Sequence, residues 1–139
     1  MKTEQIVIDT NVIVSALRSS KGASHKLVSL IGTGLFEINI SVALVLEYEY
    51  AAKKSALVSA EHVDNVINYI CSVANERHPH FLWRPFLRDP NDDFVLELAV
   101  EAGYRFIVTH NLRDFEGSVE FGVKAITPCE FLRKTGVIK

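Results

Sequence analysis

Short apolar runs that end in polar residues alternate along this chain with stretches whose apolar positions recur at helical spacing. The first run, Gln5–Ile8, stops at the polar triplet Asp9-Thr10-Asn11. A buried strand that ends in polar residues is typical of a parallel sheet, where functional sites lie beyond the strand ends. The same pattern predicts four further strands, at Phe36–Ile40, Phe81–Leu87, Arg105–Thr109 and Val123–Ile126.

Helices are predicted between these strands, over residues 12–18, 23–31, 42–54, 60–76, 90–102 and 128–133. Ser41 should cap the third of them, because its hydroxyl can accept a hydrogen bond from the first turn. Asp89 and Pro90 are typical of an N-cap and a first helical position. Strands that alternate with helices predict a three-layer α/β/α sandwich around a five-stranded, mainly parallel sheet, in one domain over residues 1–139.

Composition narrows the class of protein. The chain of 139 residues is 48% hydrophobic and 23% charged, as in soluble globular domains. Cys71 and Cys129 match no zinc spacing and are expected to be reduced thiols. No targeting segment and no apolar run of about 20 residues is recognisable, so we expect a cytoplasmic protein without membrane contact. The net charge of −2 argues against a protein that coats nucleic acid non-specifically. It does not argue against a nuclease whose acidic residues are gathered in one site.

Two acidic residues fall just beyond predicted strands. Asp9 follows the first strand, and Asp114 lies a few residues after the fourth. A carboxylate in such a place is unfavourable unless it is hydrogen-bonded, paired or bound to a cation. Asp9 taken alone is explained equally well as a cap of the following helix.

Glu47 interrupts an apolar stretch of the predicted helix after Ser41, since its neighbours at helical spacing are Ala43, Leu44 and Ala51. The other interpretation is a glutamate at the edge of the core with its carboxylate in water. Glu49 should point into solvent.

Asp92 stands at the head of a stripe with Leu96 and Ala99 that should face the sheet. An acid in the first turn of a helix is also favoured by the helix dipole and by the capping box, which is the alternative for Asp92. Asp93, Glu97 and Glu101 form a second stripe that is expected to be a solvated face.

Four carboxylates at one sheet edge would repel one another unless a divalent cation lay among them. Oxygen ligands suit Mg²⁺ or Mn²⁺, and such ions support hydrolysis of phosphodiester bonds. His78 and His80 flank a proline and are expected to be loop residues and not metal ligands.

These segments resemble the motifs of the PIN-domain family over nearly the whole chain. Val7 to Val12 resembles the opening strand of the family, and Ser41 to Glu47 its second motif. Asp89 to Asp93 resembles the third motif, and Ile107 to Phe115 the fourth; residues 128–132 resemble the family's end.

The resemblance implies Mg²⁺- or Mn²⁺-dependent cleavage of RNA. Many small members are VapC-like toxins of toxin–antitoxin pairs, which form homodimers and are silenced by a partner protein. Carried over by position, Asp9, Glu47 and Asp92 match the first three acids of the family. Where many members have a further aspartate this chain has Asn111, and Asp114 is the expected substitute.

The resemblance thus implies a set of site residues. The catalytic acids would be Asp9, Glu47, Asp92 and Asp114, with Asp9, Asp92 and Asp114 on the metal. Asn11, Thr109 and Asn111 match polar positions that help to hold the site or the scissile phosphate. RNA binding also needs basic residues at the rim of the site. The candidates are Arg18, Lys21, Lys26, Lys53 and Lys54. The alternative for each of them is an ordinary surface charge.

Three other functions are compatible with parts of the pattern. A haloacid-dehalogenase-like phosphatase would need an aspartate at Asn11, and a phosphate-accepting receiver domain would need one at the end of the third strand. A PIN scaffold that binds RNA or a protein without cutting is the non-enzymatic alternative, and Asn111 together with the negative net charge favours it.

Overall fold

The computed structural model describes residues 3–55, 58–78, 93–101 and 106–138. Its strands are β1 (Glu4–Ile8), β2 (Phe36–Ile40), β3 (Asn75–Glu76), β4 (Phe106–Val108) and β5 (Lys124–Ile126). The α-helices are α1 (Thr10–Arg18), α2 (Ala23–Ser29), α3 (Val42–Ser55), α4 (Ala60–Val73), α5 (Asp93–Glu101) and α6 (Pro128–Lys134). The short 3-10 helices η2 (Leu112–Phe115) and η3 (Ser118–Phe121) lie between β4 and β5.

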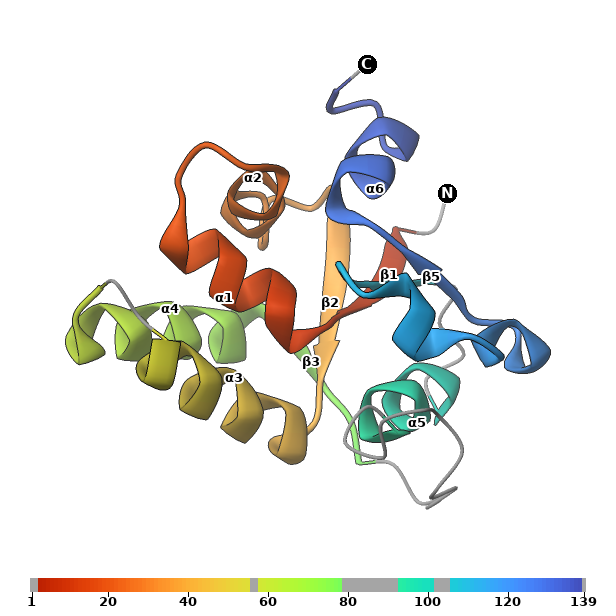
Figure 1. The fold of residues 1–139 in the computed structure, drawn as a ribbon, viewed down its shortest axis with the longest axis horizontal. Coiled ribbons are helices and arrows are strands. Elements are labelled where there is room, and N and C mark those ends of the chain that lie inside the picture. The colour runs from red at the N-terminus through yellow and green to blue at the C-terminus, as the bar shows by residue number, and fades with distance from the viewer. Residues whose placement is uncertain (1–2, 56–57, 79–92, 102–105, 139) are drawn as a thin grey trace.

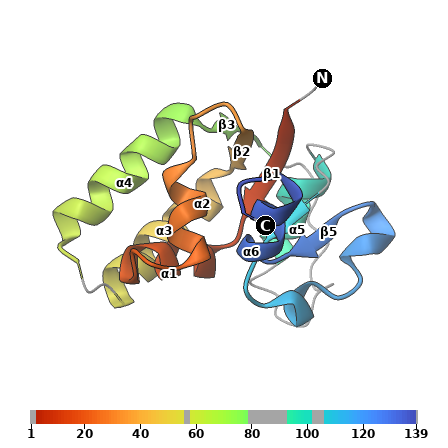
Figure 2. The ribbon, with the colours of Figure 1, turned by 90° about the horizontal axis from the view of Figure 1, so that it is seen from above.

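The sheet is parallel throughout its five described strands, with the order β3-β2-β1-β4-β5. Crossovers between parallel strands are right-handed. The first two crossovers run in one direction, from β1 to β2 to β3, so their helices must share one face. The next crossover returns past β1 to β4 and must cover the other face. Figures 1 and 2 show this arrangement, with α1 to α4 on one side of the sheet and α5 on the other.

The core consists of the strands and the inner faces of these helices. Ile6, Val7 and Ile8 of β1 are almost fully buried, as expected for a central strand. The closing helix α6 packs against α2, and its Phe131 ring stands edge-on to Phe36 at 5.5 Å. The predicted α/β fold around a five-stranded parallel sheet is therefore confirmed.

The third strand lies elsewhere than predicted. The helical pattern of residues 60–76 ends at Val73, and Asn75–Glu76 pair with Asn39 and Ile40 of β2. The reason is the open edge of β2, whose Ile40 carbonyl also accepts from the amide of Arg77 at 2.8 Å. The strand predicted at 81–87, and the helix start predicted at Asp89 and Pro90, lie outside the described residues.

Helix α5 is buried on more sides than its pattern predicts. Leu96 and Ala99 are fully buried as expected, but so are Val95 and Leu98, and Glu97 is only 3% exposed. The prediction of a solvated stripe is therefore wrong at Glu97, because α5 contacts β1 and β4 on one side and α3 on another. The side chains of Asp93 and Glu101 lie outside the described part of the chain.

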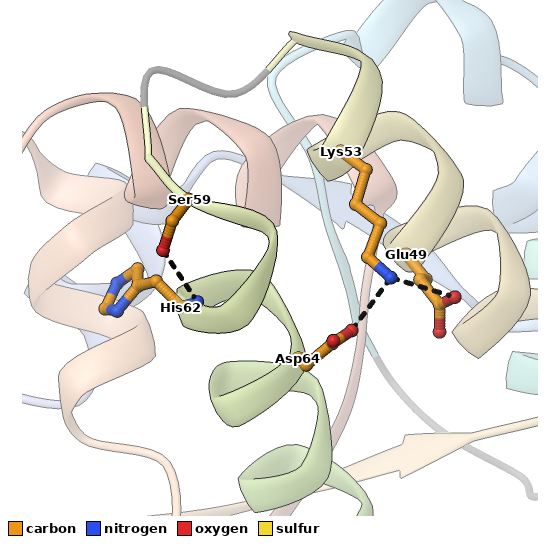
Figure 3. A network of polar contacts seen from close by, with 5 residues as sticks. All are labelled: Glu49, Lys53, Ser59, His62 and Asp64. Atoms are coloured by element: carbon orange, nitrogen blue, oxygen red, sulfur yellow. Dashed lines mark hydrogen bonds and ion pairs between the residues drawn. The ribbon is translucent and has the colours of Figure 1, made fainter.

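Helices α3 and α4 are joined at the surface by charged side chains (Figure 3). Lys53 Nζ lies 2.9 Å from Asp64 Oδ1 and 3.4 Å from Glu49 Oε1. Ser59 caps α4 by accepting a hydrogen bond of 3.1 Å from the amide of His62. Glu49 is thus a surface residue, as predicted.

Two further expectations concern cysteines and membranes. Cys71 is exposed, Cys129 is half-buried, and both are free thiols as expected. Among the helices that the structure describes, none has the length and apolar character needed to cross a bilayer.

Candidate functional site

Asp9 occupies the point where the chain leaves β1 and enters α1. Its side chain is 5% exposed. Oδ1 accepts a hydrogen bond of 2.9 Å from the backbone amide of Thr10, so Asp9 caps α1. A helix cap was one of the two roles that the sequence allowed for Asp9. Oδ2 accepts from Thr109 Oγ1 at 2.7 Å and from Asn11 Nδ2 at 3.1 Å. The carboxylate is therefore held rigidly by donors from two strand ends.

The position of this carboxylate follows from the topology. The crossovers that leave β1 and β4 depart to opposite sides, which opens a crevice between the carboxyl ends of these neighbouring strands. The backbone amide of Asp9 continues the ladder by donating to the Val108 carbonyl at 2.9 Å. Asp9 and Thr109 thus lie side by side at the switch point of the sheet.

Burial raises the pKa of Asp9 to about 6, from an ordinary value of 3.8. The hydrogen bonds from Thr109 and Thr10 act in the opposite direction, and the neighbouring charges of Glu47 and Asp114 raise the pKa further. Desolvation is thus the dominant cause, and a nearby cation would relieve it.

Glu47 reaches this site from α3. Thr10 Oγ1 donates a hydrogen bond of 2.7 Å to Glu47 Oε2. The sequence placed Glu47 within a buried face that includes Ala43, but Ala43 is exposed and the buried stripe is formed by Leu44, Tyr48 and Ala52. Glu47 is half-buried beside that stripe, so its carboxylate belongs to the edge of the core and borders the crevice.

Tyr48, the next residue, fixes α3 against the end of β1. It is 1% exposed, and its hydroxyl donates a hydrogen bond to the Ile8 carbonyl. Burial raises the pKa of Tyr48 well above its usual range, so the hydroxyl remains a donor. The contact sets the distance between α3, which carries Glu47, and the strand that carries Asp9.

The segment after β4 is held by a chain of hydrogen bonds. Thr109 is fully buried, and its Oγ1 accepts from the amide of Asn111 at 3.0 Å while donating to Asp9. Asn11 Oδ1 accepts from the amide of His110 at 3.2 Å. The His110 ring shares a hydrogen bond of 2.6 Å with Ser24 Oγ on α2. Sequence reasoning missed Ser24 and His110, since no pattern links positions 86 residues apart.

A pocket of about 570 Å³ lies beside Asp9, and its size is typical of ligand sites. Five of the acidic and amide residues singled out from the sequence are among those that line it: Asp9, Asn11, Glu47, Asn111 and Asp114. Thr109 lies behind Asp9, where it positions the carboxylate and is too deeply buried to contact a substrate. Asp92 lies outside the described residues.

One basic candidate reaches this pocket. Arg18 and the hydroxyl residues Ser15, Ser19 and Ser55 contribute to its walls. Of the five basic residues expected at the rim, Arg18 is the one that lines it among the described residues. Lys53 is instead engaged with Asp64 and Glu49.

The chemistry of the donors fits a hard divalent cation. Carboxylate and amide oxygens converge on the pocket from β1, α3 and the loop after β4, and Mg²⁺ is bound through one or two carboxylates while it keeps several waters. Within the described ranges, which exclude Asp92, no three acidic, histidine or cysteine side chains are grouped closely enough to hold an ion. A divalent cation held by these residues would therefore keep several of its waters.

Comparison with known proteins gives two matches. A family model described as PIN domain matches residues 5–113. A chain in the crystal structure of VapBC2 from Rickettsia felis, bound to a DNA fragment from their promoter, is similar in fold with a TM-score of 0.63. The likeness covers 88% of this chain and 98% of that chain at 15% sequence identity, so it concerns the fold. A sequence comparison with curated proteins gives no significant match.

Proposed function

The chain belongs to the PIN-domain family, and from that premise we propose that it is a metal-dependent ribonuclease that hydrolyses RNA phosphodiester bonds as the toxin of a toxin–antitoxin pair. The observation that carries the proposal is Asp9, a buried carboxylate held by Thr10, Asn11 and Thr109 at the mouth of a pocket. Asp9 has more hydrogen bonds than a helix cap requires, and its raised pKa marks a site that favours a cation.

We assign Asp9, Asp92 and Asp114 to the metal, directly or through water. A bound Mg²⁺ or Mn²⁺ would lower the pKa of a water and offset the charge that develops on the phosphate. Glu47, which Thr10 holds at the pocket, would orient the attacking water and accept its proton. The guanidinium of Arg18 and the side-chain amide of Asn111 lie at the pocket wall, where they would hold phosphate oxygens.

The proposal is tested by offering single-stranded and structured RNAs to the purified protein with Mg²⁺ or Mn²⁺. Asp9→Asn, Glu47→Gln and Asp92→Asn should each reduce cleavage at least about a hundredfold, because each removes a charge that acts at the reacting phosphate. Asp64→Asn is the matched control, since Asp64 forms a surface ion pair on α4 away from the pocket. Equal cleavage by Asp9→Asn and Asp64→Asn would contradict the assignment.

Metal binding can be measured without catalysis. Mn²⁺ should raise the melting temperature of the wild-type protein by mass action and should leave that of Asp9→Asn almost unchanged. No shift of either protein at millimolar Mn²⁺ would favour the second candidate, a PIN scaffold that binds RNA or a protein without cutting it. Asn111, in place of the aspartate that many members have, is the observation in favour of that scaffold.

The partners that we propose are an antitoxin protein and a second copy of the chain, with cytoplasmic RNA as the substrate. The fold likeness to a chain of the VapBC2 complex supports an antitoxin. The exposed apolar side chains of Val42, Leu46 and Tyr50, spaced by four residues along α3, support a dimer. Light scattering on the wild type and on Leu46→Lys tests the dimer, because a charge there should shift the protein to monomer.

A further inference from the structure

A second pocket, of about 330 Å³, lies between helices α1, α2 and α4. Its walls are partly apolar and carry polar groups at the margin: Leu17, Arg18, His25, Val28, His62 and Val66. Apart from Arg18, none of its residues takes part in the proposed hydrolysis. His25 Nδ1 lies 3.4 Å from the Ala16 carbonyl at the end of α1. Figure 3 shows the His62 ring on the opposite side of α4 from the Asp64–Lys53 ion pair.

The second pocket adjoins the pocket that Asp9, Glu47 and Asp114 line, called the acidic pocket below. Arg18 and Ser19 line both of them, so the end of α1 is their shared wall. Thr10 in the acidic pocket and Arg18 stand at opposite ends of α1, roughly 12 Å apart at 1.5 Å per residue. Stacked nucleotides repeat every 3.4 Å or so. A strand whose phosphate lies beside Asp9 would therefore reach the second pocket, at the end of α1, about three or four nucleotides further on.

The residues of the second pocket have the chemistry that recognises a nucleobase. Unpaired bases stack on aromatic rings, including histidine, and on arginine planes, and their edges take hydrogen bonds. His25, His62 and Arg18 supply such planes, while Leu17, Val28 and Val66 supply apolar walls. Ser19, Ser20 and Ser29 add hydroxyls that can both donate and accept.

The charge of the chain strengthens the argument. A net charge of −2 and an acidic active site provide little of the non-specific attraction that holds RNA to basic proteins. Contacts to bases can supply affinity that net charge does not, because stacking of a base contributes about 1–3 kcal/mol. Arg18 offers the local cation for the phosphate between the two pockets.

We propose that the pocket between α1, α2 and α4 binds an unstacked nucleobase of single-stranded RNA, a few nucleotides along the strand from the phosphate held at the acidic pocket. The inference rests on the proposed function and adds a base-binding subsite to it: the nucleotide bound there must be unpaired, since a base in a duplex cannot enter the pocket. A double-stranded RNA of the same sequence should therefore be a poor ligand.

Binding is measured with a short fluorescein-labelled single-stranded RNA and the Asp9→Asn protein, in which the proposed cleavage is suppressed. Adding His62→Ala, or filling the pocket with Val66→Trp, should weaken binding about fivefold or more, as expected for the loss of one stacked base. His78→Ala and Val119→Trp are the matched controls, because both residues are exposed and lie outside the pocket. The controls should bind within about twofold of the parent, and circular dichroism checks that Val66→Trp is folded.

A photoreactive uridine placed along the same RNA provides a second readout. It should crosslink to peptides that contain His25 or His62 at one nucleotide position and not at the others. Unaltered binding by both His62→Ala and Val66→Trp, crosslinks that avoid α2 and α4, or the absence of saturable RNA binding would each overturn the proposal.

The two proposals fail separately. Cleavage that depends on Asp9 but is indifferent to His62 and Val66 overturns the base pocket and leaves the nuclease standing. RNA binding that depends on His62 and Val66 without any cleavage by the wild type overturns the nuclease and leaves the base pocket standing.

Discussion

Thr109 Oγ1 donates a hydrogen bond of 2.7 Å to Asp9 Oδ2 and joins two strand ends that are 100 residues apart in the chain. Thr109 is fully buried, and the same oxygen accepts from the amide of Asn111. Because this oxygen accepts one bond and donates another, the direction of the bond to Asp9 is fixed. Thr109 thus orients the carboxylate on which the proposed chemistry depends.

Replacing Thr109 with valine keeps the shape of the side chain and removes the hydroxyl. The Asp9 carboxylate would lose its strongest hydrogen bond, so the pKa of Asp9 should rise further. The free energy of unfolding at pH 7 should fall by about 1.5–3 kcal/mol, the range for a hydrogen bond to a charged group. Urea denaturation measures the change, and Thr109→Ser should restore most of the loss. A valine variant as stable as the wild type would contradict the role assigned to the hydroxyl.

The stability of the metal-free protein should depend on pH through Asp9. Its pKa is about 6 in the folded chain against 3.8 for the ordinary group, so the folded state retains a proton that the unfolded state loses. The stabilisation from that proton is fully present below pH 3.8 and is lost as pH rises through 6. The loss is on the order of 3 kcal/mol at neutral pH.

Asp9→Asn has no such proton to lose. In EDTA, denaturation curves of the two proteins should therefore diverge between pH 4 and pH 7 or so, with the wild type losing stability relative to the variant. A difference that stays constant over this range would mean that Asp9 titrates at its ordinary pKa.

Tyr48→Phe should destabilise the protein by about 1–3 kcal/mol, because the Ile8 carbonyl loses a donor where no water can replace it. Tyr69→Phe is the control: its hydroxyl donates to the Ile31 carbonyl at 3.0 Å, but the side chain is 50% exposed. Water can replace that bond, so the control should lose less than Tyr48→Phe in thermal denaturation. Equal losses would contradict the proposed fixing of α3 to β1.

Ser24→Ala tests whether the bond between Ser24 and His110 positions the loop after β4. The loop carries Asn111 and leads to Asp114 in η2, so its loosening should lower RNA cleavage about tenfold, as small displacements of reacting groups do. The melting temperature should change little. Ser72→Ala, which removes an exposed serine bonded within α4, should leave cleavage unaffected. A similar cleavage rate in Ser24→Ala and Ser72→Ala would assign the Ser24 bond to stability alone.

The sequence predicted those parts of the site that depend on strand order. Asp9 and Asp114 could be placed near each other because the carboxyl ends of parallel strands share one edge of a sheet. Glu47 was found because an acid stood among apolar residues, although the buried stripe proved to be Leu44, Tyr48 and Ala52.

Features that depend on contacts between distant elements escaped sequence reasoning. The strand at Asn75–Glu76 exists because β2 has an open edge, and two residues are too few to show a strand pattern. The burial of Glu97 follows from α3 and the sheet meeting α5 from different sides. The pairing of Ser24 with His110 leaves no periodic signal in the chain.

The wide separation of Asp9 and Thr109 has a consequence for the cell during synthesis. A ribosome delivers Asp9 first, and β4 follows only after some hundred further residues. Until β4 pairs with β1, the Asp9 carboxylate has neither its Thr109 donor nor the crevice around it. Under the proposed function, a half-made or prematurely terminated chain should therefore leave intact the messenger RNA from which it is being translated.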